Sequence, residues 1–301
     1  MSRYLPVVLI FAVAILVGIF VGPAPPTGEI IQLRISRVVL GIFAGGILGF
    51  CGCILQGLFG NPLVEPYTLG SASGAALGGS IGILLFGAIS PLFAFLGSLG
   101  VGFFAFTIAR MKGGLFRDRL ILAGVVMSFL CSSLVMIIMV IGGRELYEIL
   151  YLLMGYLGII INATNRLFIL LLIAISLAVV IFLYRYYREL DIISQGLETA
   201  AGLGVDIQKL SLIIFFATSL VIGLTVSLVG AIGFVGLVIP HISKLLFGPK
   251  HVYNLPASFI LGAIFLLFAD TVSRTISVYE FPVGVVTSLV GIPFFIYLYR
   301  K

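Results

Sequence analysis

Long apolar runs separated by short polar connections make up most of this chain. A helix needs about 20 mostly apolar residues to cross a bilayer. One run does not meet this requirement: Leu146–Ile161 is short, is broken by Gly155 and Gly158, and follows the polar stretch GGRELYE. We expect a half-buried helix there rather than a crossing. The pattern predicts an all-α membrane protein, a polytopic bundle of about ten transmembrane helices in a single domain, 1–301. The expected spans are Leu5–Val21, Val38–Leu58, Leu69–Phe86, Leu92–Ala109, Leu120–Ile141, Leu167–Leu183, Leu210–Val229, Gly233–Phe247, Leu255–Thr271 and Val283–Leu298.

Composition supports the membrane assignment. The 301 residues are 61% hydrophobic and only 9% charged, with a mean hydropathy of +1.29, which is outside the range of ordinary soluble domains. The 37 glycines and the lack of alternating ten-residue strands favour closely packed helices over a barrel. The net charge of +6 comes without runs of Lys and Arg among aromatics, so we expect no nucleic-acid partner.

The residues that bind metals or form disulfides are sparse. Cys51, Cys53 and Cys131 lie inside apolar runs and fit neither a disulfide framework nor a zinc site. His241 and His251 are ten residues apart, with no acidic or cysteine partner nearby in the sequence. We therefore predict no metal site.

The basic residues predict the orientation, because short cytoplasmic loops carry an excess of Lys and Arg. An even number of spans places both termini on one side. If that side is cytoplasmic, five of the 17 basic residues lie outside: Arg34, Arg37, Arg144, Arg166 and Arg274. The other twelve lie inside: Arg3, Arg110, Lys112, Arg117, Arg119, Arg185, Arg188, Lys209, Lys244, Lys250, Arg300 and Lys301. We expect cytoplasmic termini and a multi-pass protein in contact with membrane lipid.

The longest polar connection on the predicted cytoplasmic side is DIISQGLETAAGLGVDIQKL, Asp191–Leu210. Ser194 can cap the start of a short helix and Gly204 can end it, and Asp206 can cap the next helix. Two short helices with small residues would form a compact knob joined at both ends to long spans. From the residues alone, a socket-fitting knob and a plain solvated loop are both open.

Several long motifs follow one another in order along the chain. They are LRISRVVLGIFAGG (33–46), QGLFGNPLVEPYTLGSASGAALGG (56–79), GAIGFVGLVIPHISKLLFGPKH (230–251), LPASFILGAIFLLFADTVSR (255–274) and EFPVGVVTSLVGIPFFIYLYRK (280–301). Together they resemble the FecCD family, the permease subunits of ATP-binding cassette (ABC) importers for iron-siderophore, haem and vitamin B12.

The resemblance implies a location in a bacterial or archaeal cytoplasmic (inner) membrane and a set of partners. A second permease copy would enclose the pathway, two ATPase subunits would bind beneath, and an extracytoplasmic solute-binding protein would dock outside. ATP and Mg would bind the ATPase subunits and no cofactor would bind this chain. The region 188–209 would then be the coupling region, with these contact residues: Gly196, Leu197, Glu198, Thr199, Ala200, Gly202, Leu203 and Gly204. Leu197 and Ala201 stand where relatives often carry an acid and an arginine, so shape and apolar fit would matter more than ion pairs.

Three further sets of residues are implied by the resemblance. Arg34 and Arg37, just outside the second span, and Arg274, after the ninth, would meet acidic residues of the binding protein. The alternatives are long side chains extended to the interface and, for Arg274, a pair with Asp270 one helical turn earlier. A cytoplasmic gate would be built by the turn after the second span, Asn61, Pro62 and Leu63; the alternative is an ordinary tight turn. Small residues of the fifth span, either lining the pathway or packing, are Gly124, Ser128 and Ser132, whereas Gly70, Gly74 and Gly78 of the third span favour packing.

An ABC importer permease for an iron chelate or cobalamin is the function that these observations favour. The chain has no GxxxxGK[ST] phosphate loop and is not expected to be an enzyme. The alternatives are an ion-coupled secondary transporter, for which Glu65 and Asp270 are the candidate ionisable groups, and a molybdate-type oxyanion importer of the same family. The sequence leaves the cargo open, and with it the choice between a homodimer and a pair with a related permease.

Overall fold

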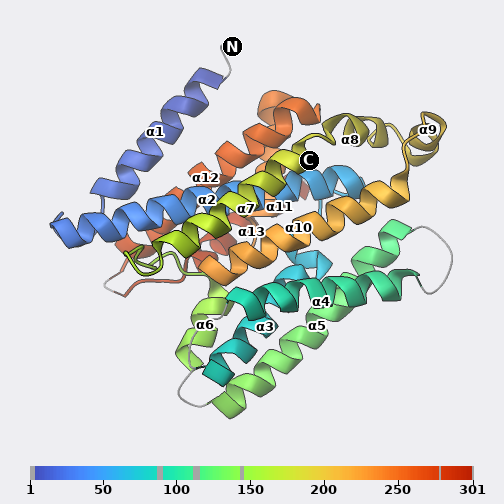
Figure 1. Cartoon of the computed structure of the whole chain (residues 1–301). Coiled ribbons are helices and arrows are strands. Elements are labelled where there is room, and N and C mark those ends of the chain that lie inside the picture. The colour runs from blue at the N-terminus through green and yellow to red at the C-terminus, as the bar shows by residue number, and fades with distance from the viewer. Residues whose placement is uncertain (1–3, 87–90, 111–115, 143–145, 278, 300–301) are drawn as a thin grey trace.

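The computed structural model describes residues 4–86, 91–110, 116–142, 146–277 and 279–299, and in this part of the chain every regular element is helical (Figure 1). The elements are α1 Tyr4–Phe20, α2 Gly28–Phe59, η1 Pro66–Leu69, α3 Ser71–Phe86, α4 Pro91–Arg110, α5 Phe116–Gly142, α6 Leu146–Met154, α7 Arg166–Tyr184, α8 Tyr187–Ile193, α9 Leu197–Gly202, α10 Ile207–Val229, α11 Val235–Phe247, α12 His251–Thr275 and α13 Val283–Tyr299.

The prediction of an all-helical membrane protein is confirmed. Each of the ten predicted spans corresponds to one helix, namely α1 to α5, α7 and α10 to α13. Six helices of the described chain are long and apolar enough to cross a membrane, and four shorter apolar helices complete the set. The run Leu146–Ile161 forms the short helix α6 followed by non-helical backbone, which agrees with the predicted break at Gly155.

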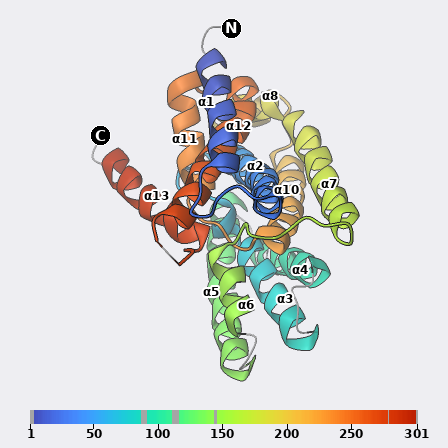
Figure 2. The same cartoon turned by 90° about the vertical axis from the view of Figure 1, so that its left-hand side faces the viewer.

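The helices form two groups with α10 between them. In one group α3 packs on α4 and α5, and α6 covers the end of α3. In the other, α2 pairs with α12, and α1, α11 and α13 pack around this pair. The two views place α3 to α6 together on one side of the molecule and α12, α1 and α11 on the other (Figure 2). Helix α10 contacts both α2 and α4 and thereby joins the groups.

The α2–α12 pair forms the core of the second group because glycines allow the two backbones to touch. A Cβ atom on Gly45 would lie 2.3 Å from the carbonyl oxygen of Gly262, and one on Gly52 would lie 2.0 Å from that of Gly236 in α11. Small residues at such contacts let membrane helices pack closely. Helix α2 is therefore the central support of the fold, with most of its residues buried.

Non-helical backbone meets in the middle of the molecule. The segment after α6 pairs with the α10–α11 connection, since Tyr156 N–H donates to Val229 O at 2.8 Å and Ala231 N–H donates to Leu152 O at 2.7 Å. The α12–α13 connection joins them where Val283 N–H donates to Gly155 O at 3.2 Å. Irregular backbone in a membrane protein is tolerated where it is buried in protein or lines a cavity. This meeting point is accordingly the place to look for a pathway.

Candidate functional site

The first candidate region is an arginine cluster, formed by Arg34, Arg37 and Arg274. Helix α2 begins at Gly28, ten residues before the predicted start of the span, so Arg34 and Arg37 lie within the helix and not outside it. Arg34 is buried and donates to the carbonyl oxygens of Ile19 at 3.2 Å and Ala24 at 2.7 Å. These carbonyls lie at and just beyond the end of α1, where helix acceptors lack partners within the helix.

Arg37 and Arg274 share the carboxylate of Asp270. Arg37 Nη1 lies 2.9 Å from Asp270 Oδ1, and Arg274 Nε lies 3.3 Å from Asp270 Oδ2. The pairing of Arg274 with Asp270 is the alternative to docking that the sequence offered for Arg274. Arg37 also pairs with Glu280 and stacks over the Tyr156 ring, 5.5 Å from its centroid. The three arginines and Asp270 are at most 7% exposed. The long side chains are thus paired inside the chain and do not extend to an interface.

Glu280 is the accessible member of the arginine cluster. Its side chain is 34% exposed, against 5% for those of Arg37 and Asp270. An acidic group approaching from outside would meet Arg37 only by displacing Glu280. The docking role of the cluster stays a prediction. In such docking, a carboxylate of the binding protein would replace Glu280 as the partner of Arg37.

The gate loop, residues 60–65, breaks the chain between α2 and η1 as the two prolines predicted. Gly60 ends α2 in the left-handed conformation, and Asn61 Oδ1 accepts a hydrogen bond from Leu63 N–H at 2.9 Å. This tight turn leaves Pro62 and Leu63 exposed, with Leu63 51% accessible. An apolar side chain held at the tip of a rigid turn is suited to contact with another subunit.

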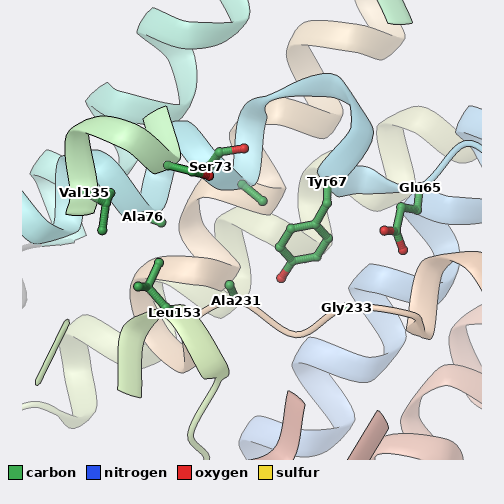
Figure 3. A pocket seen from close by; sticks show the side chains of 10 residues that line it. Glu65, Tyr67, Ser73, Ala76, Val135, Leu153, Ala231 and Gly233 are labelled. Carbon is green, nitrogen blue, oxygen red and sulfur yellow. The ribbon is translucent and has the colours of Figure 1, made fainter. Parts of the chain in front are cut away.

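A cavity of about 340 Å³ lies beside the central non-helical backbone (Figure 3). It is lined by Glu65, Tyr67, Ala72, Ser73, Ala76, Ser132, Val135, Leu153, Ala231 and Gly233. A second hollow of about 330 Å³ shares Leu153, Ala231 and Gly233 and continues along α13. The two hollows therefore form one groove between α5 and α13, with a weakly polar wall.

Glu65 brings a carboxyl group to this cavity. Its Oε2 accepts a hydrogen bond from Phe234 N–H at 3.3 Å, at the start of α11. The hydroxyl of Tyr67 accepts one from Ile232 N–H, so two side chains of one short segment fasten the α10–α11 connection. Glu65 lies in the connection between helices. Burial raises the pKa of its carboxyl above the ordinary value, and the hydrogen bond from Phe234 opposes this with a smaller effect.

The small residues of the fifth span divide between packing and the cavity. A Cβ atom on Gly124 would lie 2.6 Å from Thr68 O, so Gly124 allows α5 to approach η1. Ser128 accepts a hydrogen bond from Ser73 at 2.8 Å and donates to Gly124 O. Ser132 alone of the predicted lining set borders the cavity. In α3, Gly74 and Gly78 face the carbonyl oxygens of Gly97 and Phe93 in α4, in agreement with a packing role.

The coupling segment, residues 188–209, projects from one end of the bundle (Figure 1). It contains most of α8, then α9, and the start of α10. Gly204 follows α9 at a φ of +84°, and Asp206 accepts a hydrogen bond from Lys209 N–H at 3.0 Å, as predicted for these two residues. Ser194 was wrongly predicted as an N-cap: it ends α8, because the chain already turns helical at Tyr187, and Gly196 precedes α9.

Most of the predicted contact residues of the coupling segment are exposed. Ala200 is buried and anchors α9, whereas Glu198, Thr199 and Gly202 are exposed and Leu203 is 64% accessible. The segment is a protrusion of two short helices with an exposed leucine, and its role as a knob for a partner stays a prediction. Within α9 the charged residue is Glu198, since Leu197 and Ala201 add none, whereas Arg188, Asp206 and Lys209 carry exposed charge on the flanking parts of the segment.

Three contacts of charged residues could not be predicted from the sequence patterns. Arg37 meets Asp270, which is 233 positions away, and also Glu280. His251, which has no acidic residue near it in the sequence, bonds Asp191 from α8, 60 positions away. No cluster of three or more potential metal ligands occurs among the described residues, and the three cysteines are buried and free.

The chain matches the model of the FecCD transport family over residues 7–301. It is 38% identical over 283 residues to the cobalamin import system permease protein BtuC of Halobacterium salinarum, covering 92% of this chain and 75% of the relative. It is 36% identical to the hemin transport system permease protein HmuU of Yersinia pestis, with 89% and 80% covered.

A solved structure shows the same architecture. This inward-facing structure, assigned to the metal-chelate type of ABC transporter, superposes with a TM-score of 0.84 at 31% identity and covers 100% of this chain and 99% of its own. The fold is that of an ABC transporter permease. The chain belongs to the FecCD transport family.

Proposed function

We propose that this chain is the permease subunit of an ABC importer that takes up an iron chelate, such as a siderophore complex or haem, or cobalamin. The exposed coupling segment, continuous with α7 and α10, is the observation that carries the proposal. A protrusion joined to two long helices converts a push from a cytoplasmic subunit into tilting of those helices. Relatives named for cobalamin and hemin transport support this range of cargoes.

The proposed assembly contains two copies of this chain. The groove between α5 and α13 is open along one face, and a second copy facing it would close it into a pathway. The apolar, exposed side chains of α5 beside the groove, including Phe129 at 72% accessibility, suit such an interface. The exposed tip of the gate loop, Leu63, would meet its counterpart there and close the pathway.

The remaining partners act from the two sides of the membrane. Two ATPase subunits, carrying ATP and Mg, would receive the coupling segments on the cytoplasmic side, where both termini lie. A solute-binding protein would dock over the arginine cluster outside and would hold the specificity for cargo. The groove carries one carboxyl group, Glu65, and otherwise apolar and hydroxyl side chains, so its contacts with cargo would be weak.

The experiment that tests the proposal is reconstitution of the chain in liposomes with its cognate ATPase and binding protein. A panel of ferric siderophore, haem, cobalamin and molybdate would be offered with and without ATP. We expect uptake of one chelate class only with ATP and the binding protein. A chain that assembles with no ATPase would contradict the proposal, and uptake of molybdate alone would replace the cargo class.

The gate is tested separately by cysteine crosslinking. Asn61→Cys and Leu63→Cys, each placed in a chain whose three native cysteines are replaced, should crosslink the two copies in the resting state. The crosslink should weaken when a trapped nucleotide state opens the gate. Crosslinking that is the same in all nucleotide states would rule out a gate at this turn.

Glu65 is the observation that favours the alternative of ion-coupled transport, because it places an ionisable group in the cavity. The variant Glu65→Gln, assayed without ATP across an imposed proton gradient, separates the two mechanisms. We expect no gradient-driven uptake by either the wild type or the variant, since the proposed energy source is ATP.

A further inference from the structure

The coupling segment is fastened to the first turn of α12 at one polar site. Asp191 Oδ1 accepts a hydrogen bond from His251 N–H at 2.8 Å and lies 2.6 Å from His251 Nδ1. Next to it, the Tyr184 hydroxyl at the end of α7 donates to Val252 O at 3.2 Å. Tyr184, before α8, and Asp191, within α8, therefore hold two consecutive residues of α12.

His251 connects this site to α2. His251 is 2% exposed, and its ring lies against Gly57. A Cβ atom added to Gly57 would lie 2.3 Å from His251 Nε2. Because the Asp191 carboxylate accepts from Nδ1–H, the other ring nitrogen carries no proton in the neutral ring, and Nε2 has no hydrogen-bond partner. The ring thus fills the space over Gly57 by shape, with its polar contact on the side of α8.

Gly57 lies in the last turn of α2, three residues before Gly60 and the gate loop. A continuous series of contacts therefore runs from α8 through Asp191 and His251 to the end of α2. Helix α8 also packs on both α2 and α12. Apolar packing between helices allows sliding, whereas a short pair of hydrogen bonds to one carboxylate fixes the register of α8 on α12.

We infer that Asp191 and His251 are positioning residues that transmit movement of the coupling segment to the gate-bearing end of α2. The inference rests on the proposed function of the chain. It predicts a specific defect: when the link is removed, the ATPase still binds and hydrolyses ATP, but hydrolysis no longer opens the gate efficiently. A purely structural role would instead lower the amount of folded complex.

The test is the ratio of cargo imported to ATP hydrolysed by the reconstituted complex, measured for Asp191→Ala, His251→Ala and the double variant. Residues that carry coupling between sites change it by about 2- to 30-fold. We expect each single variant to lower the ratio about tenfold while assembly with the ATPase is kept. The double variant should lower it no further than the singles, because both changes break one link.

Asn162→Ala is the matched control. Asn162 Oδ1 accepts from Thr164 N–H and Asn165 N–H in the turn before α7, so this variant also removes side-chain bonds at the start of a helix, away from the coupling segment. It should leave the ratio unchanged. Asp191→Asn keeps an acceptor oxygen for His251 N–H, so it should lower the ratio less than Asp191→Ala does, by about threefold.

The outcomes separate this inference from the proposed function. If the wild-type complex shows no ATP-driven uptake, the proposed function fails. If the wild type transports and Asp191→Ala keeps the wild-type ratio, or if the losses of the two single variants multiply in the double, the link is overturned. Should Asp191→Ala fail to assemble, Asp191→Asn is measured alone: a loss of about threefold supports the link, and an unchanged ratio overturns it.

Discussion

The arginine cluster and the coupling segment use opposite physical means. Three arginines and Asp270 are buried: Arg37 and Arg274 pair with Asp270, and Arg34 donates to backbone carbonyls. Glu280 is the accessible carboxylate. The coupling segment exposes small residues and Leu203 and forms few polar contacts with the bundle, among them the Asp191–His251 pair. The arginine cluster is held together by charge, whereas the coupling segment offers exposed small residues and Leu203 for contact.

This difference indicates what each region needs. Buried charges are costly unless they stay paired, so we expect the arginine cluster to resist rearrangement and a docking partner to take the place of Glu280. Helix α9 of the coupling segment carries one charged residue, Glu198, and is followed by the exposed Leu203, so contact with a partner at this helix would depend mainly on shape and apolar area. We therefore expect electrostatics to control the first region and apolar fit to control the second.

The largest effect is expected from breaking the charge cluster. Arg37→Met leaves Asp270 with Arg274 as its remaining cation and frees Glu280, and removing one partner of a buried pair costs about 3–5 kcal/mol. Thermal unfolding of the purified permease in lipid nanodiscs measures the loss. Arg166→Met, at an exposed arginine, should stay within about 0.5 kcal/mol of the wild type. Equal stability of the two variants would show that the cluster is not a structural requirement.

Truncating the exposed leucine of the coupling segment should have the next largest effect. Leu203→Ala removes the exposed apolar side chain that we propose to contact the ATPase and should weaken ATPase binding about tenfold, as for a well-packed interface anchor. Glu198→Gln, at an exposed charge of the adjacent helix α9, should change binding less than about threefold. Titration of the ATPase onto nanodisc-bound permease gives both affinities, and a reversed order of the two effects would refute coupling by shape.

Releasing Arg37 should strengthen docking by a smaller factor. Glu280→Gln removes the charge that competes for Arg37, so a binding protein with an acidic docking surface should bind about fivefold more tightly, mainly through faster association. Ser277→Ala, in the same connection, serves as the control because it removes no charge. Surface plasmon resonance with the permease immobilised in nanodiscs measures the rates, and weaker binding of the Glu280 variant would argue that Glu280 itself is a contact.

The smallest of the predicted effects is the salt dependence of binding, which should differ between the arginine cluster and the coupling segment. Raising ionic strength from about 0.05 to about 0.5 M shortens the screening length several-fold and should weaken binding-protein docking about threefold. Assembly with the ATPase should change less than about twofold over the same range. The same two binding assays report this, and equal salt dependence would remove the distinction between the regions.

The hydrophobic pattern was sufficient to predict the helices but not the full length of α2. Arg34 and Arg37 end the apolar run in the sequence, so the predicted span began at Val38. In the structure the helix continues through them, because carbonyls and carboxylates from α1, α12 and the α12–α13 connection satisfy both side chains. A hydropathy pattern cannot include partners supplied by distant segments.

Local signals predicted the backbone of the candidate sites better than their contacts. The prolines of the gate loop, Gly204 and the Asp206 cap were each readable from neighbouring residues. The pairs Arg37–Asp270 and Asp191–His251 join residues 233 and 60 positions apart, and no local spacing links them. Tertiary packing decides which buried charge meets which partner, and a single sequence contains no direct record of it.

ATP-driven uptake by a complex with an altered coupling segment tests the central claim most directly. Residues 196–204 would be replaced by a Gly-Ser segment of equal length, and chelate import would be measured in liposomes alongside the yield of folded permease. The account predicts a normally folded permease whose ATP-driven import falls to the level seen without ATP. Import at the wild-type rate would contradict it.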